Sequence, residues 1–279
     1  MEQMCRLAGV PRSGYYRHWR EHKPLQEETA VRDRIQALAL KQRRYGYRRI
    51  TAALQRDGFH INRKRVLRIM REDNLLCLRK KSFVPTTTQS NHRYRVWPNL
   101  ARRLTPMATD QLWVGDITYI RLDEGFVYLA VILDAFSRKV IGWALRDHMK
   151  TELTLEALDM ALATRDVTPG LVHHTDQGVQ YACTAYIEKL QSHGIQPSQS
   201  RPGCPYDNAM AESFMKTLKQ EEIYASQYRD IDHLSSAMTE FIETVYNKTR
   251  LHSALGYRPP EEYEAMTVTT NPAKFKPAA

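Results

Sequence analysis

The run Leu112-Trp113-Val114-Gly115-Asp116-Ile117-Thr118-Tyr119-Ile120 is apolar and strand-like, with one carboxylate near its centre. An unpaired buried charge is costly, so Asp116 requires a metal ion, a charged partner or a position at the mouth of a site. A second apolar run covers residues 170–175, and Asp176 follows it directly. A third carboxylate, Glu212, lies just inside a helix-like segment, with 35 residues between it and Asp176. These three acidic residues organise the interpretation of the chain.

Three carboxylates from separate elements suit one kind of chemistry in particular. Cleavage and joining of phosphodiesters by two Mg²⁺ ions requires hard oxygen ligands that converge on metals about 4 Å apart. One ion activates the attacking oxygen, and the other stabilises the leaving oxygen. We therefore expect Asp116, Asp176 and Glu212 to be both the catalytic residues and the ligands of two Mg²⁺ (or Mn²⁺) ions.

Five sequence words, in order and at characteristic spacing, resemble those of a known protein family. They are Trp113-Val114-Gly115-Asp116-Ile117-Thr118-Tyr119-Ile120, Leu133-Asp134-Ala135-Phe136-Ser137-Arg138, His174-Thr175-Asp176-Gln177-Gly178-Val179-Gln180-Tyr181, Tyr206-Asp207-Asn208-Ala209-Met210-Ala211-Glu212-Ser213-Phe214, and Tyr246-Asn247 with Arg250-Leu251-His252-Ser253-Ala254-Leu255-Gly256-Tyr257. The chain resembles the catalytic, OrfB-type transposases of the insertion sequence three family, within the retroviral-integrase-like superfamily. The resemblance covers roughly residues 45–265.

The resemblance implies a DNA transposase, or integrase, that moves an insertion sequence. Such an enzyme nicks the 3′ ends of the element and transfers the freed 3′-OH to a phosphodiester, without a covalent protein–DNA intermediate. It further implies a circular intermediate, two synapsed DNA ends and therefore a homo-oligomer on DNA. In this family an upstream reading frame often supplies a partner protein through a fusion product, so such a partner is also expected.

The fold class expected is α/β, with a ribonuclease-H-like core of mixed sheet flanked by helices. Strands are predicted at 111–121, 126–134, 138–145, 170–175 and 195–199, and helices at 151–164, 181–193, 208–222 and 231–247. The first two strands are joined by a hairpin signal, Asp123-Glu124-Gly125. Three meander strands followed by alternating helices and strands indicate the mixed sheet, and the resemblance implies the ribonuclease-H-like arrangement.

An all-α region with helix-turn-helix character precedes this core. Residues 1–109 hold 25 Lys/Arg against 8 Asp/Glu, a net charge of +17, whereas the remainder carries −7. Helices are predicted at 25–40, 48–57 and 63–73, the last capped by Asn62. A helix, a tight connection and a basic helix are the arrangement that places a recognition helix in the major groove. A plain basic helical bundle is the alternative.

The predicted domain limits follow from these patterns. Residues 1–78 form the helical DNA-binding region, best defined at 41–76, and 79–109 form a basic linker punctuated by proline. Residues 110–265 form the catalytic core, and 266–279 form a tail. Residues 1–20 are compatible with a second small helix-turn-helix or with the remnant of a longer upstream domain.

Further candidate residues are assigned to DNA or to support of the carboxylates. Arg63, Lys64, Arg65 and Arg68 are the face of the basic helix that we expect to contact DNA. Lys216 and Lys219 lie four and seven residues after Glu212, on the same helical face, and are expected to hold phosphates. The alternative is an ordinary surface Glu–Lys pair. His174 and Asn208 are weaker candidates for orienting a metal ligand, and a histidine in the position of His174 is more often a satisfied strand-end residue.

Composition excludes several other classes of protein. Four dispersed cysteines form no Cys-x-x-Cys pair, which argues against a disulfide framework or a zinc site and suits a reducing cytoplasm. No apolar stretch is long enough to span a membrane, so no membrane partner is expected. We expect a bacterial, cytoplasmic, nucleoid-associated protein whose partner is double-stranded DNA, both element ends and target.

Two alternatives remain open from sequence. One is a metal-dependent nuclease of the same fold, which cuts DNA without joining it. The other is a non-catalytic DNA-binding regulator that keeps the scaffold. The intact set of three carboxylates, followed by Lys216 and Lys219, argues against the regulator.

Overall fold

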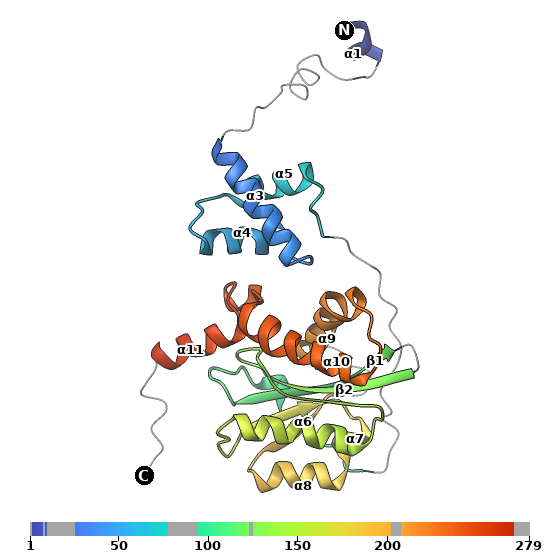
Figure 1. The fold of residues 1–279 in the computed structure, drawn as a ribbon. Helices are drawn as coiled ribbons and strands as arrows, with labels where there is room; N and C mark the ends of the chain where they lie inside the picture. Colours follow the sequence, from blue (N-terminus) through green and yellow to red (C-terminus); the bar gives the residue numbers. More distant parts are fainter. Residues whose placement is uncertain are drawn as a thin grey trace. The chain divides into compact units, whose positions relative to one another are not determined.

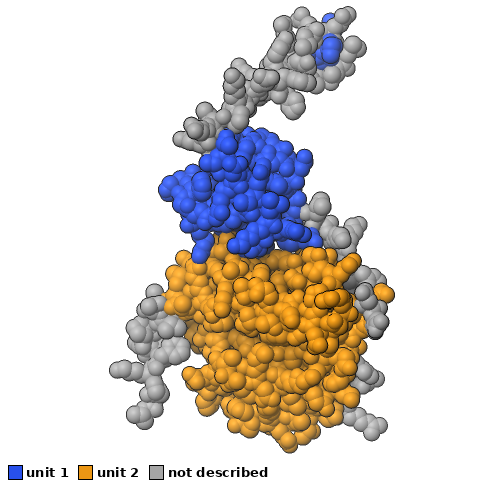
Figure 2. Space-filling model, viewed as in Figure 1, with its two compact units in different colours: residues 1–78 blue, residues 79–279 orange. Residues whose placement is uncertain are grey.

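The computed structural model describes residues 2–7, 9, 26–77, 94–122, 125–201 and 208–270. The chain divides into two compact units, residues 1–78 and 79–279 (Figure 2). Among the described residues, no helix has the length and apolarity needed to cross a membrane. Predicted features at the Asp123-Glu124 turn, in residues 79–93 and in residues 202–207 lie outside the described residues.

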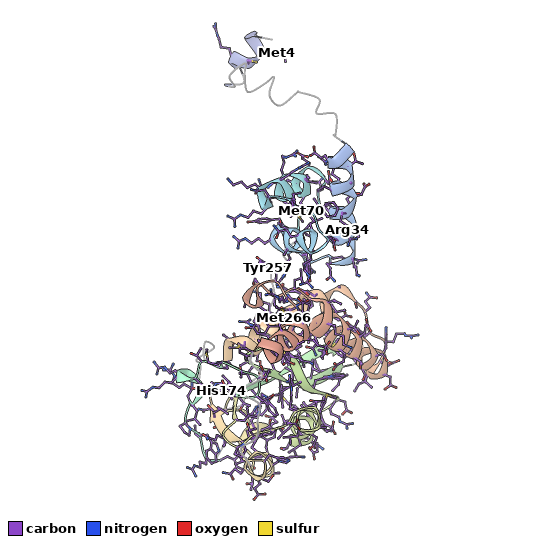
Figure 3. All side chains as sticks on the ribbon, turned by 90° about the vertical axis from the view of Figure 1, so that its left-hand side faces the viewer. Met4, Arg34, Met70, His174, Tyr257 and Met266 are labelled. Atoms are coloured by element: carbon purple, nitrogen blue, oxygen red, sulfur yellow. The ribbon has the colours of Figure 1, made fainter. Side chains whose placement is uncertain are left out.

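The N-terminal unit contains a three-helix arrangement. Its helices are α3 (Gln26–Lys41), α4 (Tyr47–Arg56) and α5 (Arg63–Glu72), preceded by the short α1 (Glu2–Leu7). Fully buried apolar side chains from all three helices form its core: Ile35, Ile50, Leu54, Val66, Ile69 and Met70 (Met70 is marked in Figure 3). As expected, Asn62 caps α5 by accepting a hydrogen bond from the backbone N–H of Lys64 at 2.8 Å. Gly58, at φ +88°, follows α4 in the left-handed region.

A five-stranded mixed sheet forms the centre of the second unit, in the order β3-β2-β1-β4-β5. The strands are β1 (Leu112–Leu122), β2 (Gly125–Asp134), β3 (Val140–Arg146), β4 (Val172–Thr175) and β5 (Gln196–Gln199). β1, β2 and β3 pair antiparallel, whereas β4 pairs parallel with both β1 and β5. This topology confirms the predicted three-stranded meander followed by parallel strands.

Helices cover both faces of the sheet (Figure 1). One face packs on α6 (Thr151–Thr164), α7 (Val179–Ala182) and α8 (Thr184–Ser192). The other packs on α9 (Ala209–Glu221) and α10 (Ile231–Thr239). Two separate apolar clusters result, because alternate residues of each central strand point to opposite faces. The predicted α/β class with a flanked mixed sheet is confirmed.

The C-terminal part of the core continues from α10 without a break. The π-helical η4 (Glu240–Thr249) extends α10, then η5 (Ser253–Leu255) and α11 (Pro260–Thr270) follow. The shorter 3₁₀ segments η1 (Ala101–Arg103) and η3 (Ile223–Ala225) lie before β1 and after α9. The predicted core limit at residue 265 falls inside α11.

Several predicted elements differ from those observed. The helix expected at 181–193 is two helices, α7 and α8, separated at Cys183, whose backbone is extended (φ −67°, ψ 151°). Residues 94–109, part of the predicted linker, contact the core: the backbone N–H of Trp97 donates to Gln199 of β5 at 2.9 Å, and that of Leu100 donates to Ser198 at 2.9 Å. Polar side chains of β5 therefore hold this segment against the sheet edge.

Candidate active site

Asp116, within β1, and Asp176, directly after β4, lie at matching distances from the end of the β1–β4 ladder. The last pair of the parallel β1–β4 ladder is Val114 with His174, and each aspartate lies two residues beyond that pair. Adjacent strands are about 4.8 Å apart, and residues two apart point to the same face of a sheet. The two carboxylates therefore lie side by side at the carboxyl end of β4, where the ladder opens.

Short-range hydrogen bonds orient both aspartates. Asp116 accepts from the backbone N–H of Ile117 at 2.9 Å, and Asp176 accepts from the backbone N–H of Gly178 at 2.9 Å. A Cβ atom at position 178 would lie 3.0 Å from the Oδ1 atom of Asp176, so glycine permits this close turn. Each carboxylate is thus oriented by a backbone N–H group one or two residues further along the chain. Both lie beside the point where the β1–β4 ladder ends.

Helix α9 brings the third carboxylate to this edge. Its apolar face, Ala211, Phe214, Met215 and Leu218, is buried in the core, which leaves Glu212 exposed in the first turn. Asn208, at the N-cap position of α9, donates its side-chain N–H to the backbone carbonyl of Gly115 at 3.1 Å. The start of α9 is therefore fixed to the residue immediately before Asp116.

Electrostatics couples the three acids. Burial raises the pKa of Asp116 to about 8, and the negative charges of Asp176 and Glu212 add to the increase. The hydrogen bond from Ile117 and the positive charge of Lys219 act in the opposite direction. Partial burial of its carboxylate also raises the pKa of Glu212. A cation between these groups would offset both the desolvation and the mutual repulsion.

The two predicted lysines of α9 have different surroundings. Lys216 is exposed. Lys219 is half-buried, with its Nζ atom 4.8 Å from the ring centroid of Tyr119. Burial lowers the pKa of Lys219, and the charge of Asp116 opposes that shift. Lys219 therefore lies within electrostatic reach of Asp116, whereas Lys216 faces solvent on the same side of α9.

The donor set suits a hard divalent cation. All three acids offer carboxylate oxygens, the ligands that Mg²⁺ and Mn²⁺ prefer, and they come from three different elements. Within the described ranges, no three His, Cys, Asp or Glu side chains stand close enough to form a ready-made metal cluster.

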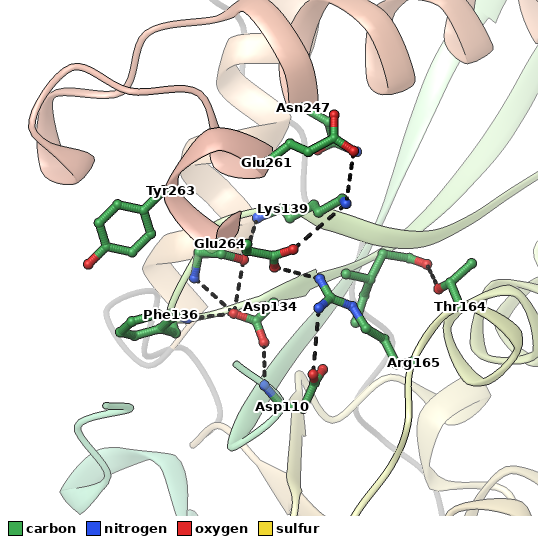
Figure 4. A network of polar contacts seen from close by, with 12 residues as sticks. Asp110, Asp134, Phe136, Lys139, Thr164, Arg165, Asn247, Glu261, Tyr263 and Glu264 are labelled. Carbon is green, nitrogen blue, oxygen red and sulfur yellow. Dashed lines mark hydrogen bonds and ion pairs between the residues drawn. The ribbon is translucent and has the colours of Figure 1, made fainter. Parts of the chain in front are cut away.

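His174, two residues before Asp176, and Asp134, at the end of β2, have structural contacts. The Nδ1 atom of buried His174 lies 2.8 Å from the Oγ atom of Ser198 on β5 (His174 is marked in Figure 3). Asp134 accepts hydrogen bonds from the backbone N–H groups of Asp110, Phe136 and Ser137 (Figure 4). Burial raises the pKa of Asp134 to about 6. Asp134 thus stabilises the turn after β2, as its sequence context predicts.

The basic residues of α5 divide into two groups. Arg63 and Lys64 are exposed at its N-terminus. Arg68 instead forms ion pairs with Glu28 of α3 at 2.7 Å and with Glu72 at 2.9 Å. The charge of Arg65 contributes to the lowered pKa of Glu28, so Arg65 also lies near this acidic side chain of α3. Arg68 therefore links α5 to α3 through an ion pair, and Arg65 lies within electrostatic reach of the same acidic residue.

A buried ion pair supports the C-terminal end of α9. Buried Arg250 donates to both carboxylate oxygens of Glu221 at 2.8 Å, near the C-terminal end of α9. Arg250 belongs to the last of the five sequence words. A buried arginine needs an acidic partner, and this need can be anticipated from the sequence. Which residue is the partner depends on the fold.

A second ion-pair network attaches α11 to the core (Figure 4). Arg165 pairs with Glu264 at 2.5 Å and with Asp110 at 3.5 Å, and Lys139 pairs with Glu261 at 3.4 Å. The two pairs with α11, Arg165–Glu264 and Lys139–Glu261, join residues 99 and 122 positions apart in the chain. The network holds α11 beside the turn after β2. None of its residues is one of the three carboxylates.

Family models and curated relatives match nearly all of the chain. An integrase core domain model matches residues 106–205, a second matches 193–260, and an HTH-like domain model matches 26–83. The insertion element IS600 31 kDa protein of Shigella sonnei is 38% identical over 94% of this chain and 99% of its own length. Transposase InsF for insertion sequence IS3A of Escherichia coli is 34% identical over 95% of this chain and 93% of its own length.

Two further proteins are similar to this chain over most of its length. The transposase for insertion sequence element IS904 of Lactococcus lactis is 37% identical over 88% of this chain and 98% of its own. A chain of the simian T-cell lymphotropic virus intasome is similar over 83% of this chain and 74% of its own, at 15% identity and a TM-score of 0.49. By the extent and identity of the curated matches, the chain belongs to the insertion sequence three family of transposases, which carry an integrase core domain.

Proposed function

We propose that Asp116, Asp176 and Glu212 are the catalytic carboxylates of this transposase and the ligands of two divalent cations, Mg²⁺ or Mn²⁺. The observation that carries the proposal is the equivalent placement of Asp116 and Asp176 beyond Val114 and His174, with α9 fixed beside them through Asn208. The raised pKa of Asp116 supports it, because a bound cation would favour the charged carboxylate.

The reaction is 3′-end nicking of the element followed by strand transfer of the freed 3′-OH. When bound, the cations supply Lewis-acid activation of the attacking oxygen and neutralise charge on the scissile phosphate. Asp116 and Asp176 contribute oxygens from fixed backbone positions, whereas Glu212 contributes one from the first turn of α9. Lys216 and Lys219 hold DNA phosphates along α9, on the side that carries Glu212.

The N-terminal unit binds double-stranded DNA in this proposal, through Arg63 and Lys64 at the exposed start of α5. Arg65 and Arg68 belong to the same DNA-binding face, and Arg68 also pairs with Glu28 of α3. His174 and Asn208 position the carboxylates through β4 and α9 rather than by touching DNA. The protein acts as a homo-oligomer, with an upstream-frame partner, on DNA at the nucleoid in the bacterial cytoplasm.

Cation binding tests this assignment directly. Titration of Mn²⁺, followed by electron paramagnetic resonance, should show two ions bound to the wild type and reduced occupancy in Asp116→Asn and Asp176→Asn. Asp134→Asn is the matched control, because its carboxylate serves the turn after β2. Equal Mn²⁺ occupancy in wild type and Asp116→Asn would refute the ligand assignment. The nuclease and regulator alternatives are not favoured, because curated relatives across the whole chain are transposases.

A further inference from the structure

Two of the most exposed aromatic rings gather beside the candidate active site. In the described part of the chain, the exposed aromatic side chains are Tyr94, Phe126 and Tyr224. Phe126 is 52% exposed at the start of β2, and Tyr224 is 44% exposed in η3. Exposing large rings costs free energy that burial would recover, so two such rings near one site require an explanation.

The ring of Phe126 contacts that of Tyr119 of β1, and Tyr224 lies within electrostatic reach of the same residue. The ring of Phe126 meets that of Tyr119 edge-on, with centroids 5.7 Å apart. Tyr224 lies close enough to raise the pKa of Tyr119 electrostatically, after the larger effect of burial. β1, β2 and η3 therefore place three aromatic side chains together at the end of β1 beyond Asp116.

Positive charge is interleaved with these rings. The ammonium of Lys219 lies over Tyr119 at 4.8 Å, and exposed Arg121 pairs across the β1–β2 ladder with Phe126. Lys219 also lies within electrostatic reach of Asp116. The aromatic patch, defined as Tyr119, Phe126 and Tyr224 with Lys219 and Arg121, is thus connected to the carboxylates through one lysine.

Aromatic rings with nearby cations are the usual surface for unpaired nucleic acid. Bases stack on the rings while cations hold the phosphates, and such stacking tolerates any sequence because every base has a π face. Bases inside a duplex do not offer that face, so this chemistry selects unpaired nucleotides over paired ones.

We propose that the aromatic patch binds unpaired bases of the DNA strand next to the scissile phosphate, by stacking on Phe126 and Tyr224. The inference builds on the proposed placement of DNA at Asp116 and Glu212, and it specifies the form of the substrate: a DNA end that is locally unpaired. Tyr119 has one face covered by Lys219 and supports the two outer rings. Arg121 and Lys219 hold the phosphates of the same strand.

The test measures DNA binding by the full chain in EDTA, so that cleavage does not contribute. Fluorescence anisotropy would compare a labelled duplex that ends in a short unpaired tail with a blunt duplex of the same sequence. The combined variant Phe126→Leu with Tyr224→Leu removes both rings and keeps apolar bulk. The combined variant Phe126→Tyr with Tyr224→Phe keeps both rings and is the matched control.

The proposal predicts that the ring-less variant loses affinity for the tailed duplex by about 5- to 100-fold, with little change for the blunt duplex. The ring-keeping variant should match the wild type, and circular dichroism should show the same fold in all three proteins. Equal tailed-duplex affinity in the ring-less variant and the wild type would overturn the proposal. Because the assay contains no divalent cation, its result is independent of whether the three carboxylates perform the reaction.

Discussion

The side-chain amide of Asn208 donates a hydrogen bond to the backbone carbonyl of Gly115, with the Nδ2 and O atoms 3.1 Å apart. Asn208 is 7% exposed and begins the segment that becomes α9. Glu212 follows one helical turn later, and Asp116 follows Gly115 directly. One hydrogen bond therefore connects the elements that carry two of the three carboxylates.

Removal of this hydrogen bond should affect activity more than stability. Asn208→Ala leaves the Gly115 carbonyl without its donor, which should lower the free energy of unfolding by about 1–3 kcal/mol. Freed from β1, α9 should hold Glu212 less accurately, so strand transfer at a temperature far below unfolding should fall at least tenfold. Urea denaturation and a joining assay measure the two effects. Asn99→Ala, which removes a side-chain bond to the Arg102 amide, should leave joining unchanged.

The Arg250–Glu221 pair should stabilise α9 from its other end. Removing one member of a buried ion pair leaves an uncompensated charge, so Arg250→Ala should lower the free energy of unfolding by about 3–5 kcal/mol. The measurement is chemical denaturation. Arg146 makes the same two-point contact with Glu156 on the surface, and Arg146→Ala should be close to neutral. Similar losses in both variants would contradict a special role for burial.

The exposed start of α5 should set the salt dependence of DNA binding. Lys64→Ala removes one phosphate contact, so the slope of log K against log salt should decrease in magnitude by about 0.9. Filter binding on double-stranded DNA at several salt concentrations measures the slope. Arg34, labelled in Figure 3, pairs with Asp57 at 2.7 Å. Arg34→Ala should leave the slope unchanged, and an unchanged slope in Lys64→Ala would exclude that contact.

Acid should destabilise the core through His173. Burial lowers the pKa of His173 to about 3, and its Nε2 atom lies 2.8 Å from the hydroxyl of Tyr186. The unfolded chain binds a proton near pH 6.5 and the folded chain does not, so stability is full above pH 6.5 and falls as the pH decreases toward 3. The slope should be about 1.4 kcal/mol per pH unit at most.

Unfolding midpoints at pH 7, 6, 5 and 4 test this contribution. His173→Gln removes the titrating ring, and its stability should decline less with acid than that of the wild type. Exposed His193→Gln serves as the control, and its decline should match the wild type. Parallel acid profiles for His173→Gln and the wild type would show that other groups cause the acid sensitivity.

The sequence predicts the elements whose signals are local. The bounds of α6, residues 151–164, agree with the prediction, and the cap of α5 by Asn62 is confirmed. The position of Asp176 directly after β4 follows from the apolar run that ends at Thr175, whereas Asp116 lies within the apolar run of β1. Apolar periodicity and the Asn62 cap are properties of neighbouring residues, so no tertiary information is needed to read them.

Other features depend on contacts between distant residues. The helix break at Cys183 is not marked by a glycine or proline in the sequence. Helix α11 is absent from the predicted elements, although Pro260 occupies a favourable first helical position. The attachment of α11 through Arg165 and Glu264 joins residues 99 positions apart. Likewise, the ion pair of Arg68 with Glu28 joins residues 40 positions apart, whereas the DNA contact expected of Arg68 stays a prediction. Long-range ion pairs leave no periodic trace in a sequence.

The most direct test of the central claim is a joining assay on labelled linear DNA that carries the cognate element ends. Wild type and Glu212→Gln would each be assayed with Mg²⁺ and with EDTA. We predict nicked and joined products for the wild type with Mg²⁺, and neither product for Glu212→Gln or in EDTA. Joined products at wild-type yield from Glu212→Gln, or from the wild type in EDTA, would contradict catalysis by the three carboxylates and divalent cations.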